Sequence, residues 1–136
     1  MRNRTNLVYP AVLLLVAVLI MGSCKKDSSD PAPVDPVFTV TAATVNLQGG
    51  GLGLQFTAKC TNNDVKMTHV VLTDPVTGNV TYDFSGASYI KNEAFGLQES
   101  NTAYTKNTGT WKFNFVGNRK SDGVAFAVDA TLAVSK

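Results

Sequence analysis

The segment VAFAVDATLAV, residues 124–134, alternates strictly between two sets of side chains. Every second residue is apolar, and the residues between them are alanine, aspartate or threonine. Because successive side chains of a β-strand point to opposite faces of the sheet, this period predicts a strand with one buried and one solvent-facing side. After residue 36, no long window has the period of an amphipathic helix. The C-terminal part of the chain is therefore expected to be all-β.

The same alternation recurs upstream, in residues 52–60, 80–84 and 111–115. Turn-forming glycine, asparagine, aspartate and proline residues separate these segments. They occur at residues 49–51, 61–64, 74–79 and 117–123. About seven short strands with regular turns predict a single antiparallel β-sandwich of the immunoglobulin-like type, with a small β-barrel as the alternative. The phrase GTWKFNF at 109–115 also resembles the penultimate strand of such sandwiches.

Two segments break the regular alternation. In residues 38–47, Phe38 and Val40 are in one phase and Val45 and Leu47 in the other. This slip predicts a β-bulge, or an edge strand that changes sheets. In residues 65–72 both phases are apolar, which predicts a strand covered on both faces.

The N-terminus has the organisation of a secretory signal. Arg2 and Arg4 precede an uninterrupted apolar run at 11–21, and the composition becomes polar from Cys24 onward. The run is too short to cross a bilayer as a helix, which takes about 20 residues. A basic start followed by a short apolar core is typical of a cleaved signal peptide, here residues 1–23.

The stretch LIMGSC, residues 19–24, resembles the lipobox of bacterial lipoproteins. Its continuation CKKD, residues 24–27, is similar to the start of lipoproteins of the Bacteroidota. The resemblance implies that Cys24 becomes the new N-terminus, is diacylated on sulfur, and attaches the protein to a lipid bilayer. Lys25 after the cysteine implies the outer membrane, with the domain facing the periplasm or the exterior.

Residues 24–36 predict a lipidated flexible linker, because they are rich in proline, serine and charge and poor in apolar side chains. The β domain is expected at 37–136. Loss of residues 1–23 removes two of the 12 basic residues and leaves 10 against 10 acidic ones. A mature protein that is formally neutral argues against a nucleic-acid partner.

The predicted domain contains few residues suited to catalysis or metal binding. Cys60 is in phase with Leu54 and Phe56 and is expected to be a buried thiol, and His69 is the only histidine. The glycine run at 49–53 precedes a strand and lacks the helix that a phosphate-binding loop requires. No nucleophile–base–acid set and no metal-ligand cluster can be recognised, so we expect no enzyme activity, cofactor or metal.

Four aromatic side chains, Trp111, Tyr82, Tyr89 and Tyr104, are candidates for a sugar-binding platform. Trp111 and Tyr82 are in phase with neighbouring phenylalanines and are expected in the core, which leaves Tyr89 and Tyr104 as candidate ligand-facing aromatics. The leading hypothesis is a non-enzymatic binding or interaction module, accessory to glycan uptake or adhesion, with a glycan or an envelope protein as partner. The alternatives are a structural subunit of an outer-membrane complex and, least favoured, a small hydrolase.

Overall fold

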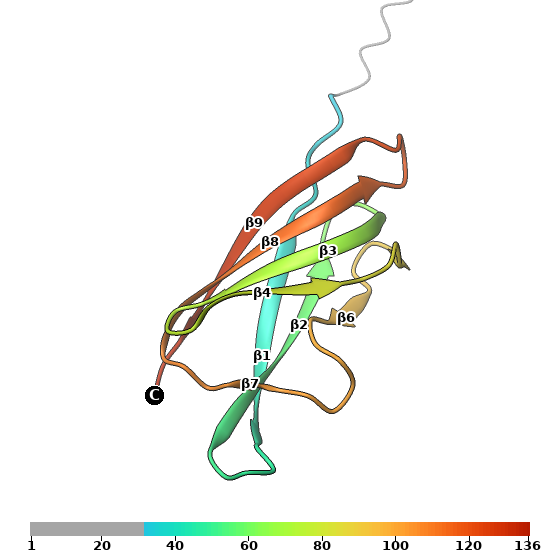
Figure 1. The fold of residues 1–136 in the computed structure, drawn as a ribbon. Coiled ribbons are helices and arrows are strands. Elements are labelled where there is room, and N and C mark those ends of the chain that lie inside the picture. The colour runs from blue at the N-terminus through green and yellow to red at the C-terminus, as the bar shows by residue number, and fades with distance from the viewer. Residues whose placement is uncertain (1–31) are drawn as a thin grey trace, which may run out of the picture. The chain divides into compact units, whose positions relative to one another are not determined.

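The computed structural model describes residues 32–136 (Figure 1). The predicted signal peptide and the candidate lipid-attachment residue Cys24 lie outside this range. Residues Val34–Lys136 form one compact unit.

The described residues form two antiparallel sheets built from nine strands. The strands are β1 (Phe38–Asn46), β2 (Leu52–Cys60), β3 (Val65–Asp74), β4 (Gly78–Asp83), β5 (Ser88–Tyr89), β6 (Ala94–Gly96), β7 (Tyr104–Thr105), β8 (Gly109–Arg119) and β9 (Ala125–Val134). The predicted all-β sandwich is confirmed. Nine strands exceed the expected seven; six of them have at least six residues, and β5, β6 and β7 have only two or three.

One sheet has the order β1-β2-β6, with β7 also on β2, and the other has the order β4-β3-β8-β9, with β5 also on β3. The chain therefore passes from sheet to sheet after β2, after β5 and after β7. With the short strands β6 and β7 counted as one, the sheets β1-β2-β6 and β4-β3-β8-β9 correspond to the A-B-E and C′-C-F-G sheets of immunoglobulin-like sandwiches. No closed barrel forms within residues 32–136, so the barrel alternative is wrong.

Aromatic side chains from both sheets form the core between them. The ring of Phe38 on β1 stacks on Phe115 of β8, with centroids 4.1 Å apart and planes 4° from parallel. At the other end of the core Phe56 on β2 contacts Trp111 and Phe113 of β8. The alternation placed all of these residues inward except Phe38, which belongs to the irregular first segment. Their burial supplies the main driving force for joining the two sheets.

The irregular pattern in the segment that forms β3 has a different cause from the one predicted. In β3, Val65 and Met67 are buried in one phase and Val70 and Leu72 in the other, all with no exposed surface. The pairing of β3 with β8 shifts register between Met67 and His69, so that Thr68 is an extra residue. The β-bulge reverses the inward phase, and the expectation of a strand covered on both faces is wrong.

The first strand, in contrast, contains no bulge. β1 pairs with β2 without interruption from Phe38 to Asn46, which corrects the predicted bulge or change of sheet. The phase slip arises on the outer face, where Val45 lies opposite Gly53. A Cβ at Gly53 would lie 2.7 Å from Cδ2 of Leu47 and 2.9 Å from Cβ of Ala103. The missing side chain therefore lets apolar residues pack on the outside of this sheet.

Candidate functional site

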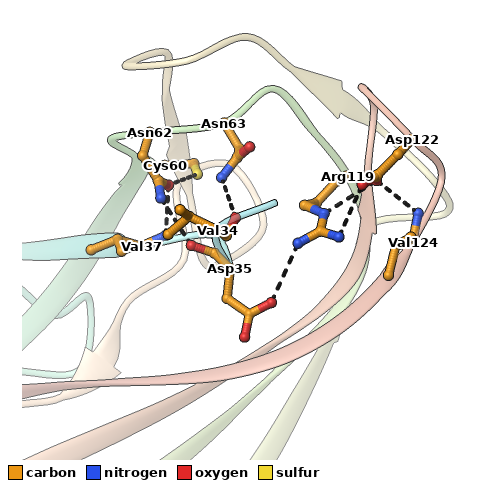
Figure 2. A network of polar contacts seen from close by, with 9 residues as sticks. All are labelled: Val34, Asp35, Val37, Cys60, Asn62, Asn63, Arg119, Asp122 and Val124. Atoms are coloured by element: carbon orange, nitrogen blue, oxygen red, sulfur yellow. Dashed lines mark hydrogen bonds and ion pairs between the residues drawn. The ribbon is translucent and has the colours of Figure 1, made fainter. Parts of the chain in front are cut away.

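The chain enters the sandwich at an end where asparagine side chains hold its backbone (Figure 2). Oδ1 of Asn62 accepts a hydrogen bond of 2.8 Å from the Val37 N–H, and Nδ2 of Asn62 donates one of 2.9 Å to the Asp35 carbonyl. Nδ2 of Asn63 donates a 3.1 Å bond to the Val34 carbonyl. The β2–β3 turn therefore fixes the last residues of the predicted linker on the domain.

Arg119 completes this end of the sandwich. It lies within the turn predicted at 117–123, but it is the last residue of β8 and only 5% exposed. Its Nε and Nη2 donate to the two carboxylate oxygens of Asp122 at 3.1 and 2.9 Å, and Nη1 lies 3.5 Å from Oδ1 of Asp35. The hydrogen bonds from Arg119, with one from the Val124 N–H, hold the pKa of Asp122 below its usual value. The end of the predicted linker thus contacts the β2–β3 turn through amide groups and the end of β8 through an ion pair.

The opposite end of the sandwich contains a hollow of about 520 Å³, which we call the distal hollow. Its lining comprises Leu47, Gly50, Gly51, Leu52, Thr105, Lys106, Thr108 and Lys136. Since β1 has nine residues, this end lies about 30 Å from the start of that strand. Figure 1 shows the β1–β2 turn and the C-terminus at this end, away from the point where the chain enters.

The shape of the distal hollow depends on the turn between β1 and β2. Gly50 and Gly51 have φ values of +87° and +91°, which favour glycine, and the Gly50 N–H donates to the Leu47 carbonyl. The alternation of residues 52–60 predicts Leu52 on the same buried face as Leu54, but Leu52 is 48% exposed. It is the first residue of β2, at the open end of the sandwich.

The distal hollow combines apolar and cationic groups. Its lining includes two leucines, Leu47 and Leu52, and two lysines, Lys106 and Lys136, whose side chains each end in an ammonium group with three hydrogen-bond donors. The lining includes no acidic and no aromatic side chain. This chemistry suits an anionic ligand with an apolar part.

Tyr89 lies away from the distal hollow. It is partly buried on β5, and its ring stacks on Phe95 at a centroid distance of 4.2 Å. Burial, with the charges of Tyr82 and Glu93, raises the pKa of its hydroxyl. Its ring is therefore largely engaged by the core cluster.

Tyr104 has a structural role that the sequence did not reveal. Its hydroxyl donates a 2.7 Å hydrogen bond to the carbonyl of Leu97, seven residues upstream, and its ring packs on Phe56. This contact resembles the tyrosine corner of immunoglobulin-like sandwiches, in which a tyrosine hydroxyl donates to a backbone group a few residues upstream. Tyr104 and Tyr89 belong to different sheets and do not form one platform.

Cys60 and His69, the cysteine and histidine of the described residues, lie in different surroundings. Cys60 is 1% exposed, as its phase predicted, and its Sγ donates to Oδ1 of Asn62 at 3.5 Å. His69 is partly exposed on β3, with Val116 and Asp83 as its neighbours on the adjacent strands. Within residues 32–136, no three His, Cys, Asp or Glu side chains are grouped as metal ligands would be.

Comparisons with protein-family models, curated proteins and solved structures find no match to this chain. The part of the chain that the structure describes contains no helix long and apolar enough to span a membrane. The function is therefore inferred from the residues themselves.

Proposed function

We propose that this chain is an outer-membrane lipoprotein attached through acyl chains on Cys24. Its β-sandwich is a non-enzymatic binding module, with an accessory role in glycan uptake or adhesion. The distal hollow is the binding surface, and its ligand is anionic with an apolar part.

One observation carries this proposal: the chain enters at one end of the sandwich, and the distal hollow lies at the other. Residues 34–37 are held by Asn62 and Asn63, next to the β8–β9 hairpin. A tether attached at this end directs the opposite end away from the lipid. The nine predicted linker residues before this held segment, 25–33, would span up to about 28 Å when extended, which allows the domain to clear the head groups.

The lining of the distal hollow favours an acidic ligand over a neutral sugar. Neutral sugar rings are commonly recognised by stacking on aromatic side chains, and the lining has none. The two lysines instead offer charge-assisted hydrogen bonds to carboxylate, sulfate or phosphate oxygens. The leucines provide apolar contact beside them.

Attachment is tested by replacing the cysteine that would carry the lipid. In cells fed a fatty-acid analogue, the parent protein should incorporate the label and sediment with membranes, and Cys24→Ala should do neither. Two acyl chains give stable attachment, whereas one gives only marginal binding, so the loss should be nearly complete. Cys60→Ala is the matched control and should keep the label, because Cys60 is buried in the domain. Equal labelling of Cys24→Ala and the parent would contradict the anchor.

Binding is tested with anilinonaphthalene sulfonate, a fluorescent probe that carries a sulfonate and an apolar ring system. We expect Lys106→Glu to weaken its binding by about three- to tenfold, because the substitution replaces an attractive charge with a repulsive one at a solvent-open site. Lys112→Glu is the matched control, since Lys112 is an exposed lysine of β8 outside the hollow. Equal affinity of the two variants for the probe would remove the distal hollow as the binding surface.

A further inference from the structure

The outer edge of β9 has no hydrogen-bonded strand partner within residues 32–136. β9 pairs with β8 over its full length and is the last strand of the order β4-β3-β8-β9. The backbone N–H and C=O groups on its other side are therefore available to a further strand. At ten residues, it is longer than β4 at the opposite edge, which has six.

β9 lacks the features that usually prevent edge pairing. It contains no proline, glycine or lysine, and its pairing with β8 has no register shift that would indicate a bulge. Its only charge is Asp129, whose Oδ1 accepts a 2.7 Å hydrogen bond from Nδ2 of Asn114. Both the backbone and the side chains of this edge therefore permit an added strand.

The same flank of the sandwich is incompletely covered. Between β9 and the edge strand β1 lies a hollow of about 220 Å³. It is lined by Ala42, Thr44, Leu54, Lys106, Leu132, Ala133, Val134 and Ser135. A strand added along β9 would cover the apolar part of this hollow.

The sequence of β9 is complementary to itself. When two copies of β9 pair antiparallel, they are related by a two-fold axis perpendicular to the sheet. Opposite residues must point to the same face, so one residue at the centre must lie opposite the same residue of the other copy. Two such registers pair nine residues of the ten-residue strand: one is centred on Asp129 and one on Ala130. The first would place two carboxylates directly opposite each other, which is unfavourable.

The register centred on Ala130 avoids this repulsion. It places Asp129 opposite Thr131 of the second copy, Val128 opposite Leu132, and Phe126 opposite Val134. Core-facing residues therefore meet core-facing residues, and the lone carboxylate meets a hydroxyl. We propose that two copies of this chain associate through antiparallel β9–β9 pairing in this register, which joins their larger sheets across an isologous interface.

Charge substitutions at Thr131 test both the interface and the register. In the proposed dimer, Thr131→Lys places each lysine opposite Asp129 of the other copy, so two ion pairs form. Thr131→Asp places carboxylates there instead. From the strength of exposed ion pairs, we expect dimer dissociation constants roughly two- to tenfold lower for the lysine variant and higher by a similar factor for the aspartate variant.

Within one copy the same substitutions act in the opposite direction. Thr131 lies opposite Lys112 of β8, so lysine would be repelled and aspartate attracted inside the monomer. The expected order of affinity, Lys above Thr above Asp, therefore cannot come from monomer stability. Thr131 is exposed, so both variants should fold, and circular dichroism would confirm this.

The measurement is sedimentation equilibrium of the full-length protein and both variants over a dilution series in one detergent. Concentration-dependent dimers in the expected order support the proposal. Monomers throughout, equal affinities, or the reverse order would overturn it. Because the readout is self-association, a failure here is distinct from a failure of the lipid anchor or of the distal hollow.

Discussion

Replacing Gly117 with alanine should destabilise the domain by about 2–3 kcal/mol, as expected for overpacking of a filled core. Gly117 faces inward on β8, opposite Met67 at the bulge of β3. A Cβ there would overlap the carbonyl oxygen of Lys66 and lie 3.1 Å from Cζ of Phe126. A backbone carbonyl cannot rotate away as a flexible side chain can, so β3 or β8 must shift.

Thermal and urea denaturation followed by circular dichroism would measure this effect. For a domain of this size we expect the midpoint of thermal unfolding to fall by on the order of 10–20 °C. Gly49→Ala is the matched control, because a Cβ at Gly49 would meet nothing within 4 Å and its φ is not positive. It should change stability by less than about 0.5 kcal/mol. Equal effects of the two substitutions would show that the bulge does not depend on a close backbone approach.

Replacing Asp74 with alanine should cost about 2 kcal/mol at neutral pH, in line with hydrogen bonds to charged groups. Asp74 ends β3 and is 8% exposed. Its Oδ1 accepts from the Val76 N–H at 2.8 Å, and both of its oxygens accept from Nδ2 of Asn107, at 3.0 and 2.7 Å. The carbonyl of Asn107 in turn accepts from Nε1 of Trp111. The carboxylate therefore joins the β3–β4 turn to the segment that leads into β8.

The contribution of Asp74 should depend on pH. Burial alone would raise the pKa of this carboxyl, but the hydrogen bonds from Val76, Asn107 and Thr77 outweigh it and lower the pKa below its ordinary value. A lowered pKa in the folded state means that the stabilisation is present above the ordinary pKa of about 3.9 and is lost as the pH falls through the lower folded value.

The pH dependence can be measured against Asp74→Asn, which has nearly the same shape but no titratable group. The difference in unfolding free energy between the parent and this variant, from urea denaturation, should be largest near pH 7 and shrink below about pH 4. Asp129→Asn, on the exposed face of β9, is a control in which we expect a smaller difference. A difference for Asp74→Asn that is constant across this range would contradict the assigned role of the charge.

Much of the fold could be predicted from local pattern. The two-residue period in β2, β8 and β9 identified the strands and their buried faces, and the burial of Phe56, Cys60 and Trp111 follows from it. The two-residue period lies within each strand's own residues. It can therefore be recognised from a short window of sequence, without knowing which strands are neighbours. The lipobox resemblance at Cys24 is likewise local, and it remains a prediction.

The candidate site was less accessible to sequence reasoning. Tyr104 was considered as a ligand-facing ring, but its hydroxyl is bonded to Leu97 in the chain before it. Arg119 was placed in a loop, but it is buried between Asp122 and the incoming linker. The lysines of the distal hollow, Lys106 and Lys136, belong to segments with no periodic pattern, and no signal in the sequence related them to Leu47 or to each other.

The amino-acid sequence by itself determined which residues alternate, and therefore that this chain forms an antiparallel sandwich with a phenylalanine-rich interior. Only the tertiary structure decided where the alternation reverses. At Thr68 one extra residue is accommodated because Gly117 on the neighbouring strand lets the backbone of β3 come close. A bulge depends on what lies across the sheet, some 50 residues away along the chain, and no local window contains that information.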